Sequence, residues 1–182
     1  MPFPAPKVIP TLVNNYKGPN LSGAEFNSGP NRTVNYNYVF PTTDEIDYYA
    51  IKGFGIIRFP FDIARAYDHA YSPLNTTQMG YIKAVVDYCT SKGMRVLLDP
   101  HNFGSIYDNR TGLRRLIGRD PEGTNLFADF WGRMATLFKN YPNIVFGLMN
   151  EPHAVNASEW YGVEDGGKFQ SNPTLGQEYR TA

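Results

Sequence analysis

The stretch Ile144-Val-Phe-Gly-Leu-Met-Asn-Glu-Pro-His153 passes from an apolar run to a polar end within ten residues. The apolar part has the length and composition of a buried strand. We expect that strand to stop at Asn150-Glu151, because Pro152 has no backbone N–H and cannot continue a sheet ladder. The pattern therefore predicts a carboxylate, Glu151, at the mouth of a buried strand with an amide beside it, an arrangement suited to general acid/base catalysis.

The composition is that of a globular chain without an excess of either charge. A chain of 182 residues with 42% hydrophobic letters can bury a sizeable core in one domain. Seventeen Lys+Arg balance 17 Asp+Glu, which does not favour nucleic acid or an anionic membrane as a partner. The longest apolar runs are strand-sized and too short to span a bilayer. We expect neither a nucleic acid nor a membrane as partner.

The N-terminus, Met1-Pro-Phe-Pro-Ala-Pro-Lys7, is rich in proline and lacks the apolar centre of a signal peptide. It is interpreted as the trimmed start of a secreted domain or as a linker remnant. Triplets of the form Asn-x-Ser/Thr begin at Asn20, Asn31, Asn75, Asn109 and Asn156. They are compatible with an extracellular, glycosylated protein, although such triplets also arise by chance.

Cys89 is the only cysteine, which excludes an internal disulfide and a cysteine-based zinc site. It falls on the apolar side of an expected helix, so a buried small hydrophobe is favoured over a reactive thiol. No cluster of His, Asp and Glu has the spacing of metal ligands. We expect no metal and no other cofactor.

Helices and strands alternate along the chain. Thr42 and Glu45 form a capping-box pattern that starts a short helix ending at Gly53. Two longer helices are expected at about residues 76–92 and 125–140 from their apolar spacing. The expected strands are residues 21–25, which are weakly indicated, and residues 54–60, 94–99 and 144–149.

This alternation, with near-continuous apolar strands, indicates an α/β fold with a parallel sheet. Polar residues stand at or beyond the strand ends: Glu25, Arg58, His101, Asn150 and Glu151. They would converge on one face of a (β/α)8 TIM barrel. A doubly wound sheet is the alternative, but it favours a Gly-rich phosphate turn that the sequence lacks.

The number of strands limits the barrel. Strand ends recur roughly every 42 residues, so eight units would need about 340 residues, and a typical barrel takes about 250. The fold is therefore expected to be of barrel type, truncated to about the first four βα units. We expect a Pro-rich segment at 1–17, the partial barrel at 18–160, and an irregular tail without strands at 161–182.

Four motifs in order carry a family resemblance: Phe40-Pro-Thr with Asp44-Glu-Ile-Asp-Tyr-Tyr and Lys52-Gly, Arg58-Phe-Pro-Phe61, Leu97-Leu-Asp-Pro-His-Asn102, and Phe146-Gly-Leu-Met-Asn-Glu-Pro-His153. Over residues 18–153 the chain resembles the N-terminal half of a glycoside hydrolase family five cellulase, an endo-β-1,4-glucanase. The resemblance implies a cellulose-like β-glucan as substrate.

The same resemblance implies roles for five residues. Glu151 would be the general acid/base of a retaining mechanism, and Asn150 would bind the sugar 2-hydroxyl. Arg58 would hold the nucleophilic carboxylate. His101 and Asn102 would line the cleft at the cleavage subsite.

Other interpretations of these residues stay open. Arg58 could form a structural salt bridge at the barrel mouth, and His101 could cap a strand end. Three weaker candidates are Glu25 at the cleft, Tyr107 as a stacking ring and Trp160 as part of a sugar platform. For each of these three, a loop, surface or packing role is preferred.

The family takes its nucleophilic glutamate from the seventh strand, and no residue of this chain matches it. A retaining mechanism needs a second carboxyl group about 5–5.5 Å from the first. One interpretation is a hydrolase whose remaining half is missing or supplied by a second copy, as a homodimer through exposed half-barrel edges. The alternative is a non-catalytic carbohydrate-binding or vestigial fragment.

Overall fold

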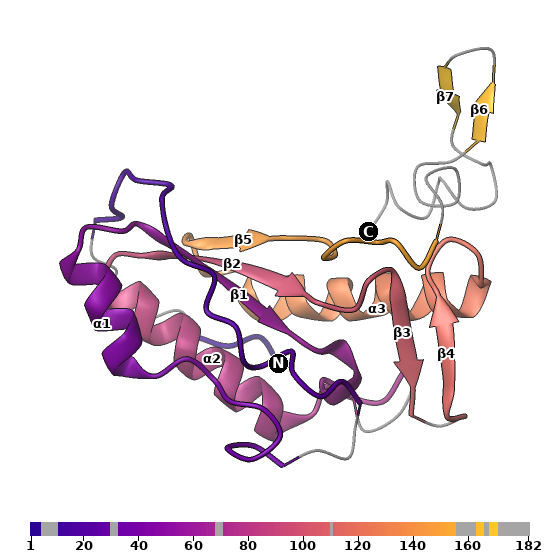
Figure 1. The fold of residues 1–182 in the computed structure, drawn as a ribbon, viewed down its shortest axis with the longest axis horizontal. Helices are drawn as coiled ribbons and strands as arrows, with labels where there is room; N and C mark the ends of the chain where they lie inside the picture. Colours follow the sequence, from indigo (N-terminus) through magenta and orange to yellow (C-terminus); the bar gives the residue numbers. More distant parts are fainter. Residues whose placement is uncertain are drawn as a thin grey trace.

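The computed structural model describes residues 1–4, 11–29, 33–67, 71–109 and 111–155, together with the backbone of 163–165 and 168–170. Its centre is a sheet of three parallel strands, β1 (Ile56–Phe61), β2 (Arg95–Pro100) and β5 (Ile144–Phe146), in the order β1-β2-β5 (Figure 1). These strands correspond to three of the four expected from the sequence, and the parallel α/β architecture is confirmed. The third strand is shorter than expected, since it leaves regular pairing at Phe146.

The first expected strand is replaced by a narrow contact along β1. Asn20 forms a single parallel bridge with Arg58, and Leu21 N–H donates to the Arg58 carbonyl at 3.0 Å. Residues 21–25 do not form a strand because the chain turns there: Phe26 N–H donates to Gly23 O, and Gly23 N–H donates to the Glu25 carboxylate. The sheet therefore has four parallel chain segments, one of them reduced to a bridge.

The two faces of the sheet differ in burial. Ile57, Phe59, Val96 and Leu98 have no exposed surface and belong to the hydrophobic core. The alternate residues, such as Arg58 and Leu97, are only half-buried. Because side chains alternate across a strand, one face packs against the helices and the other is open.

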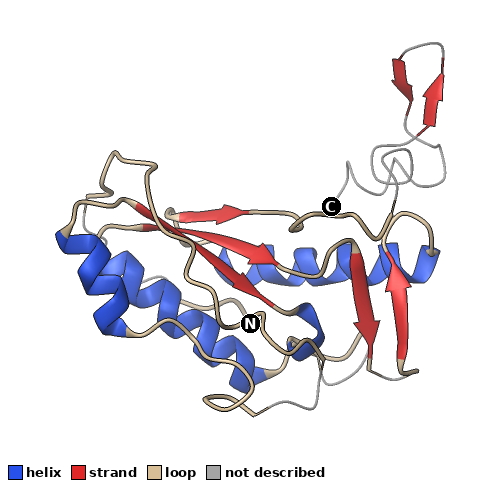
Figure 2. Cartoon of the chain, viewed as in Figure 1, coloured by secondary structure: helices blue, strands red, loops and turns tan. Residues whose placement is uncertain are grey.

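Three helices flank this sheet: α1 (Thr43–Ile51), α2 (Thr76–Ser91) and α3 (Pro121–Phe138) (Figure 2). The capping box at Thr42 is confirmed, with its hydroxyl accepting from Glu45 N–H. Helix α3 begins four residues earlier than expected, because Asp120 caps it and Pro121 occupies its first position. Side chains of α3 reach the sheet, where Trp131 and Phe146 meet edge to face at 5.4 Å.

Several short secondary-structure elements were not predicted from the sequence. They are the 3-10 turn η1 (Ile63–Arg65), the antiparallel hairpin β3 (Ser105–Asp108) and β4 (Leu113–Leu116), and the antiparallel pair β6 (Val163–Asp165) and β7 (Lys168–Gln170). The last pair corrects the expectation that the C-terminal segment holds no strand. Two glycines separate β6 from β7 in the sequence, and such a pair between two short strands is a hairpin signal. β4, Leu-Arg-Arg-Leu, lacks the apolar pattern of a strand.

The single cysteine and several of the Asn-x-Ser/Thr triplets lie among the described residues. Cys89 is completely buried, and burial raises the pKa of its thiol to about 12. Asn75 caps α2, and the Asn109 amide donates to the carbonyls of Ala64 and Tyr67. Asn31, Asn156 and Trp160 lie outside the described residues.

No helix among the described residues combines the length and apolar character needed to cross a bilayer. Those same residues hold no group of three or more His, Cys, Asp or Glu placed to bind a metal ion.

Candidate active site

Four polar side chains meet at the carboxyl ends of the three parallel strands. Arg58 comes from β1, Asp99 from β2, His101 from the residue after β2, and Asn150 from the segment after β5. The strands are in register, with Phe59 opposite Leu98 and Leu98 opposite Phe146. The parallel sheet thus brings together residues that are up to 92 positions apart.

The four side chains form a closed ring of polar contacts. Arg58 Nη2 lies 2.7 Å from Asp99 Oδ2 and 2.5 Å from Asn150 Oδ1. His101 Nδ1 lies 3.1 Å from the same Asp99 oxygen, and its Nε2 lies 3.2 Å from Asn150 Nδ2. Arg58 Nη1 also donates to Asn20 Oδ1 at 2.6 Å, so the residue at the bridge supports the ring from outside.

The ring fixes the orientation of its own amide and imidazole. A guanidinium group can only donate, so the oxygen of Asn150 faces Arg58 and its NH2 faces His101. His101 Nε2 is therefore the acceptor, and Nδ1–H donates to Asp99. The second N–H of the Asn150 amide has no partner among the described residues and is available to a bound molecule.

Asp99 is the buried member of the ring, with only 4% of its surface exposed. Burial raises the pKa of its carboxyl above the ordinary value, while His101 and Arg58 act in the opposite direction. Asp99 is not among the residues that the sequence predicts for the site. The available signal was a carboxylate within an otherwise apolar strand, which is the same signal that drew attention to Glu151.

Glu151 follows the ring directly and is exposed. Its backbone has a φ of 38°, a left-handed value that costs free energy for a side chain other than glycine. Asn150 N–H donates to Pro100 O at 2.9 Å, and His153 N–H donates to Glu151 O at 2.5 Å, so the backbone is held on both sides. Glu151 is therefore an exposed carboxylate on strained backbone, one residue after the ring residue Asn150.

Asn102 is bonded to the residues that follow β1 and is not a member of the ring. Its side chain is buried; Oδ1 accepts from Ile63 N–H at 3.0 Å, and Nδ2 donates to Asp62 Oδ1 at 2.6 Å. These bonds join the loop after β2 to η1. Asn102 thus fixes the loop after β2, whereas Arg58, His101 and Asn150 contact one another in the ring.

A cavity of about 670 Å³ opens beside His101. Its walls come from three chain segments that meet at the strand ends, and its lining residues are Glu25, Phe26, Ser28, His101, Asn102, Phe103, Ser105, Tyr107, Arg114 and His153. Phe103 lies between two imidazoles, with ring centroids 5.0 Å from His101 and 5.0 Å from His153. Glu25 and Tyr107, the weaker candidates of the sequence analysis, both line this cavity.

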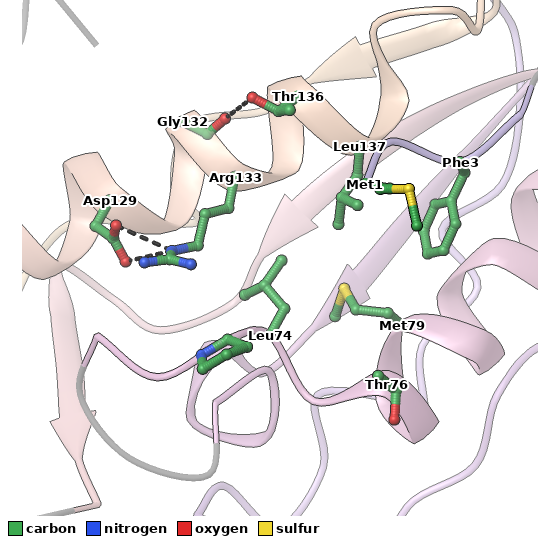
Figure 3. A pocket seen from close by; sticks show the side chains of 11 residues that line it. Met1, Phe3, Leu74, Thr76, Met79, Asp129, Gly132, Arg133, Thr136 and Leu137 are labelled. Carbon is green, nitrogen blue, oxygen red and sulfur yellow. Dashed lines mark hydrogen bonds and ion pairs between the residues drawn. The ribbon is translucent and has the colours of Figure 1, made fainter.

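A second cavity of about 610 Å³ lies elsewhere, between the N-terminal residues, the start of α2 and α3 (Figure 3). Leu74, Met79 and Leu137 give it an apolar wall, and the ion pair of Asp129 with Arg133 lies at one side. No ring residue lines it. We therefore place the candidate active site at the strand ends.

Comparison with known proteins identifies the family of the chain. The family model described as Cellulase (glycosyl hydrolase family 5) matches residues 17–174. The chain belongs to glycosyl hydrolase family 5. The ring and Glu151 lie within the matched residues.

Family 5 relatives include Endoglucanase 1 of Saitozyma flava, which is 30% identical over 154 residues, covering 80% of this chain and 41% of the relative. Endoglucanase 1 of Robillarda sp. is 38% identical over 93 residues, which are 46% of this chain and 24% of the relative. The chain thus spans well under half the length of these relatives.

Solved family 5 structures show the same fold. A variant of the endo-β-1,4-glucanase from Xanthomonas axonopodis pv. citri matches with a TM-score of 0.73 at 35% identity, over 81% of this chain and 45% of that one. The XacCel5A complex with cellopentaose matches with a TM-score of 0.71 at 34% identity, over the same shares. The fold is of (β/α)8 TIM-barrel type, and the described parallel strands form part of such a barrel.

Proposed function

We propose that this chain carries the acid/base half of a retaining endo-β-1,4-glucanase site, acting on a cellulose-like β-glucan outside the cell. The observation that carries the proposal is the exposed Glu151, on strained backbone and next in the chain to Asn150, which belongs to the ring with Arg58, Asp99 and His101. Membership of family 5 supports the choice of substrate.

Glu151 would first protonate the glycosidic oxygen and then take a proton from the water that attacks the covalent intermediate. Its exposure leaves the carboxyl group accessible to a polymer. The remaining N–H of Asn150 would donate to the sugar 2-hydroxyl, a hydrogen bond that strengthens as positive charge develops on the sugar ring. Because Arg58 and His101 already hold the amide, that donor would need no reorganisation on binding.

The nucleophile is the missing part of this mechanism. Asp99 is the acidic member of the ring, and its Oδ2 is already engaged by Arg58 and His101. The Arg58 side chain is 32% exposed on the open face of the sheet. An incoming carboxylate could pair with it there and lie near Glu151.

β5 is hydrogen-bonded to β2 on one side and to no other named strand among the described residues. A second copy that paired along this edge would complete a barrel as a homodimer. It would bring a second Glu151 to the cleft in place of a distinct nucleophile. Size-exclusion chromatography with light scattering would give the mass, and a monomer at all concentrations would reject this arrangement.

A non-catalytic carbohydrate-binding function is the second candidate, and the commitment of Asp99 within the ring favours it. Reducing-sugar release from carboxymethylcellulose separates the two candidates. The purified chain should release sugar, Glu151→Gln should not, and Glu122→Gln on α3 should behave like the parent. Binding of the polymer with equal background release from all three proteins would instead support the non-catalytic function.

A further inference from the structure

The β3–β4 hairpin presents a tyrosine and an arginine side by side to the cavity. Tyr107 and Arg114 are directly opposite in the antiparallel register, so their side chains share one face of the hairpin. Both line the cavity next to His101. The other face of β3 is anchored in the protein, with Ile106 at 2% and Asp108 at 1% exposure.

The guanidinium of Arg114 is oriented but not neutralised. Its Nε donates to Ser105 Oγ at 2.6 Å, and its two Nη atoms have no hydrogen-bond or carboxylate partner among the described residues. The next residue, Arg115, is different, since its Nη1 lies 3.2 Å from Asp120 Oδ2. Arg114 therefore offers fixed, unused donors at the cavity wall.

Another part of the cavity wall is a loop that carries Glu25 and Phe26. A buried arginine, Arg65, donates to the carbonyls of Ala24, Phe26 and Asn27 and so holds this loop from behind. Asp62 accepts from Gly29 N–H at 2.8 Å and fastens the end of the loop. These hydrogen bonds therefore hold the loop in place without a bound ligand.

The chemistry of the two walls selects a neutral polyhydroxyl ring. Tyr107 is 37% exposed and Phe26 is 52% exposed, so both have apolar ring surface available for the C–H face of a sugar. Glu25 supplies acceptors and Arg114 supplies donors, and a hydroxyl group can use both. Glu25 and Arg114 carry opposite charges, so neither an anionic nor a cationic ligand gains a net attraction from the pair.

We propose that Tyr107 and Arg114 form a subsite for a neutral glucosyl residue other than the one whose bond is cleaved. This proposal rests on the proposed function, because the cavity is continuous with His101 and the bound residue would belong to the same glucan. The hairpin would then add affinity for longer chains and take no part in the chemistry at Glu151.

The test measures binding without turnover, by titration calorimetry of cellopentaose with the Glu151→Gln protein. Adding Tyr107→Ala should weaken binding roughly three- to tenfold, as expected for loss of one aromatic contact. Tyr107→Phe should bind within about twofold of the parent, since the ring remains. Arg114→Gln, at an exposed position, is a second variant that should also weaken cellopentaose binding. It tests the site even if Tyr107→Ala does not fold.

The chain offers a matched control pair. Arg95 lies over the Tyr16 ring at 4.6 Å, at the start of β2 and not at its carboxyl end. Tyr16→Ala should leave cellopentaose affinity unchanged. A Tyr107→Ala or Arg114→Gln protein that is folded by circular dichroism and binds like the parent would overturn the proposal.

Two further outcomes also decide the matter. Tighter binding of an oligosaccharide oxidised to a terminal carboxylate would show an anion site and reject the neutral sugar. Failure of the Glu151→Gln protein to bind cellopentaose would also reject the proposal. Weakened binding in both hairpin variants, together with no sugar release by the unmodified chain, would support the subsite while rejecting the proposed hydrolysis.

Discussion

Asn150 Nδ2 lies 3.2 Å from His101 Nε2, a contact between residues 49 positions apart in the chain. It closes the ring that begins at Arg58 and Asp99. Because the imidazole accepts here and donates to Asp99, the orientation of the Asn150 amide is set before a substrate arrives.

The ring makes Asn150 and His101 energetically dependent on each other. In a double-mutant cycle with Asn150→Ala and His101→Ala, we expect a coupling free energy of about 0.5–3 kcal/mol. Urea unfolding of the four proteins measures it. Pairing His101→Ala with Tyr36→Ala, an exposed residue outside the ring, should give additive effects within about 0.5 kcal/mol.

The raised pKa of Asp99 predicts a pH dependence of stability. Between the ordinary carboxyl pKa and the raised folded value, the folded protein binds more protons at this group than the unfolded chain does. The contribution of Asp99 to the free energy of unfolding therefore grows as pH falls through that window. Comparing the parent with Asp99→Asn from pH 7 to pH 4 should show the parent gaining stability relative to the variant; the opposite slope would contradict the burial effect.

The positive φ of Glu151 predicts that function and stability oppose each other at this position. Glu151→Gly should raise the free energy of unfolding by about 1 kcal/mol, because glycine adopts this backbone conformation without a steric penalty. The same change should abolish sugar release. Glu122→Gly within α3 serves as the comparison and should lower stability by about 1 kcal/mol.

Asp62 and Arg65 form a buried ion pair beneath the cavity loop, with 1% and 4% of their side chains exposed. Asp62→Ala should cost about 3–5 kcal/mol, because it leaves the Arg65 charge buried without its carboxylate. Asp47→Ala, which breaks an exposed pair with Lys92, should have a much smaller effect. Thermal unfolding followed by circular dichroism distinguishes the two, and equal losses would argue against the buried pair as the anchor of the loop.

Much of the scaffold could be predicted because its signals are local. The capping box at Thr42 and the apolar runs of β1, β2 and β5 involve residues close together in the chain. Residues 21–25 were wrongly expected to form a strand, and the β3–β4 hairpin was not predicted. The loop at residues 21–25 is bonded to Val39 and Arg65, and β3 contacts η1, so both conformations depend on partners far away in the sequence.

The sequence alone determined the parallel α/β architecture and the carboxylate at Glu151, because apolar strand runs and helix caps depend on neighbouring residues. Only the tertiary structure decided that Asp99 joins Arg58, His101 and Asn150, and that Asn102 turns down to Asp62 and Ile63. These contacts follow from the register of parallel strands, which is set by packing across the whole sheet.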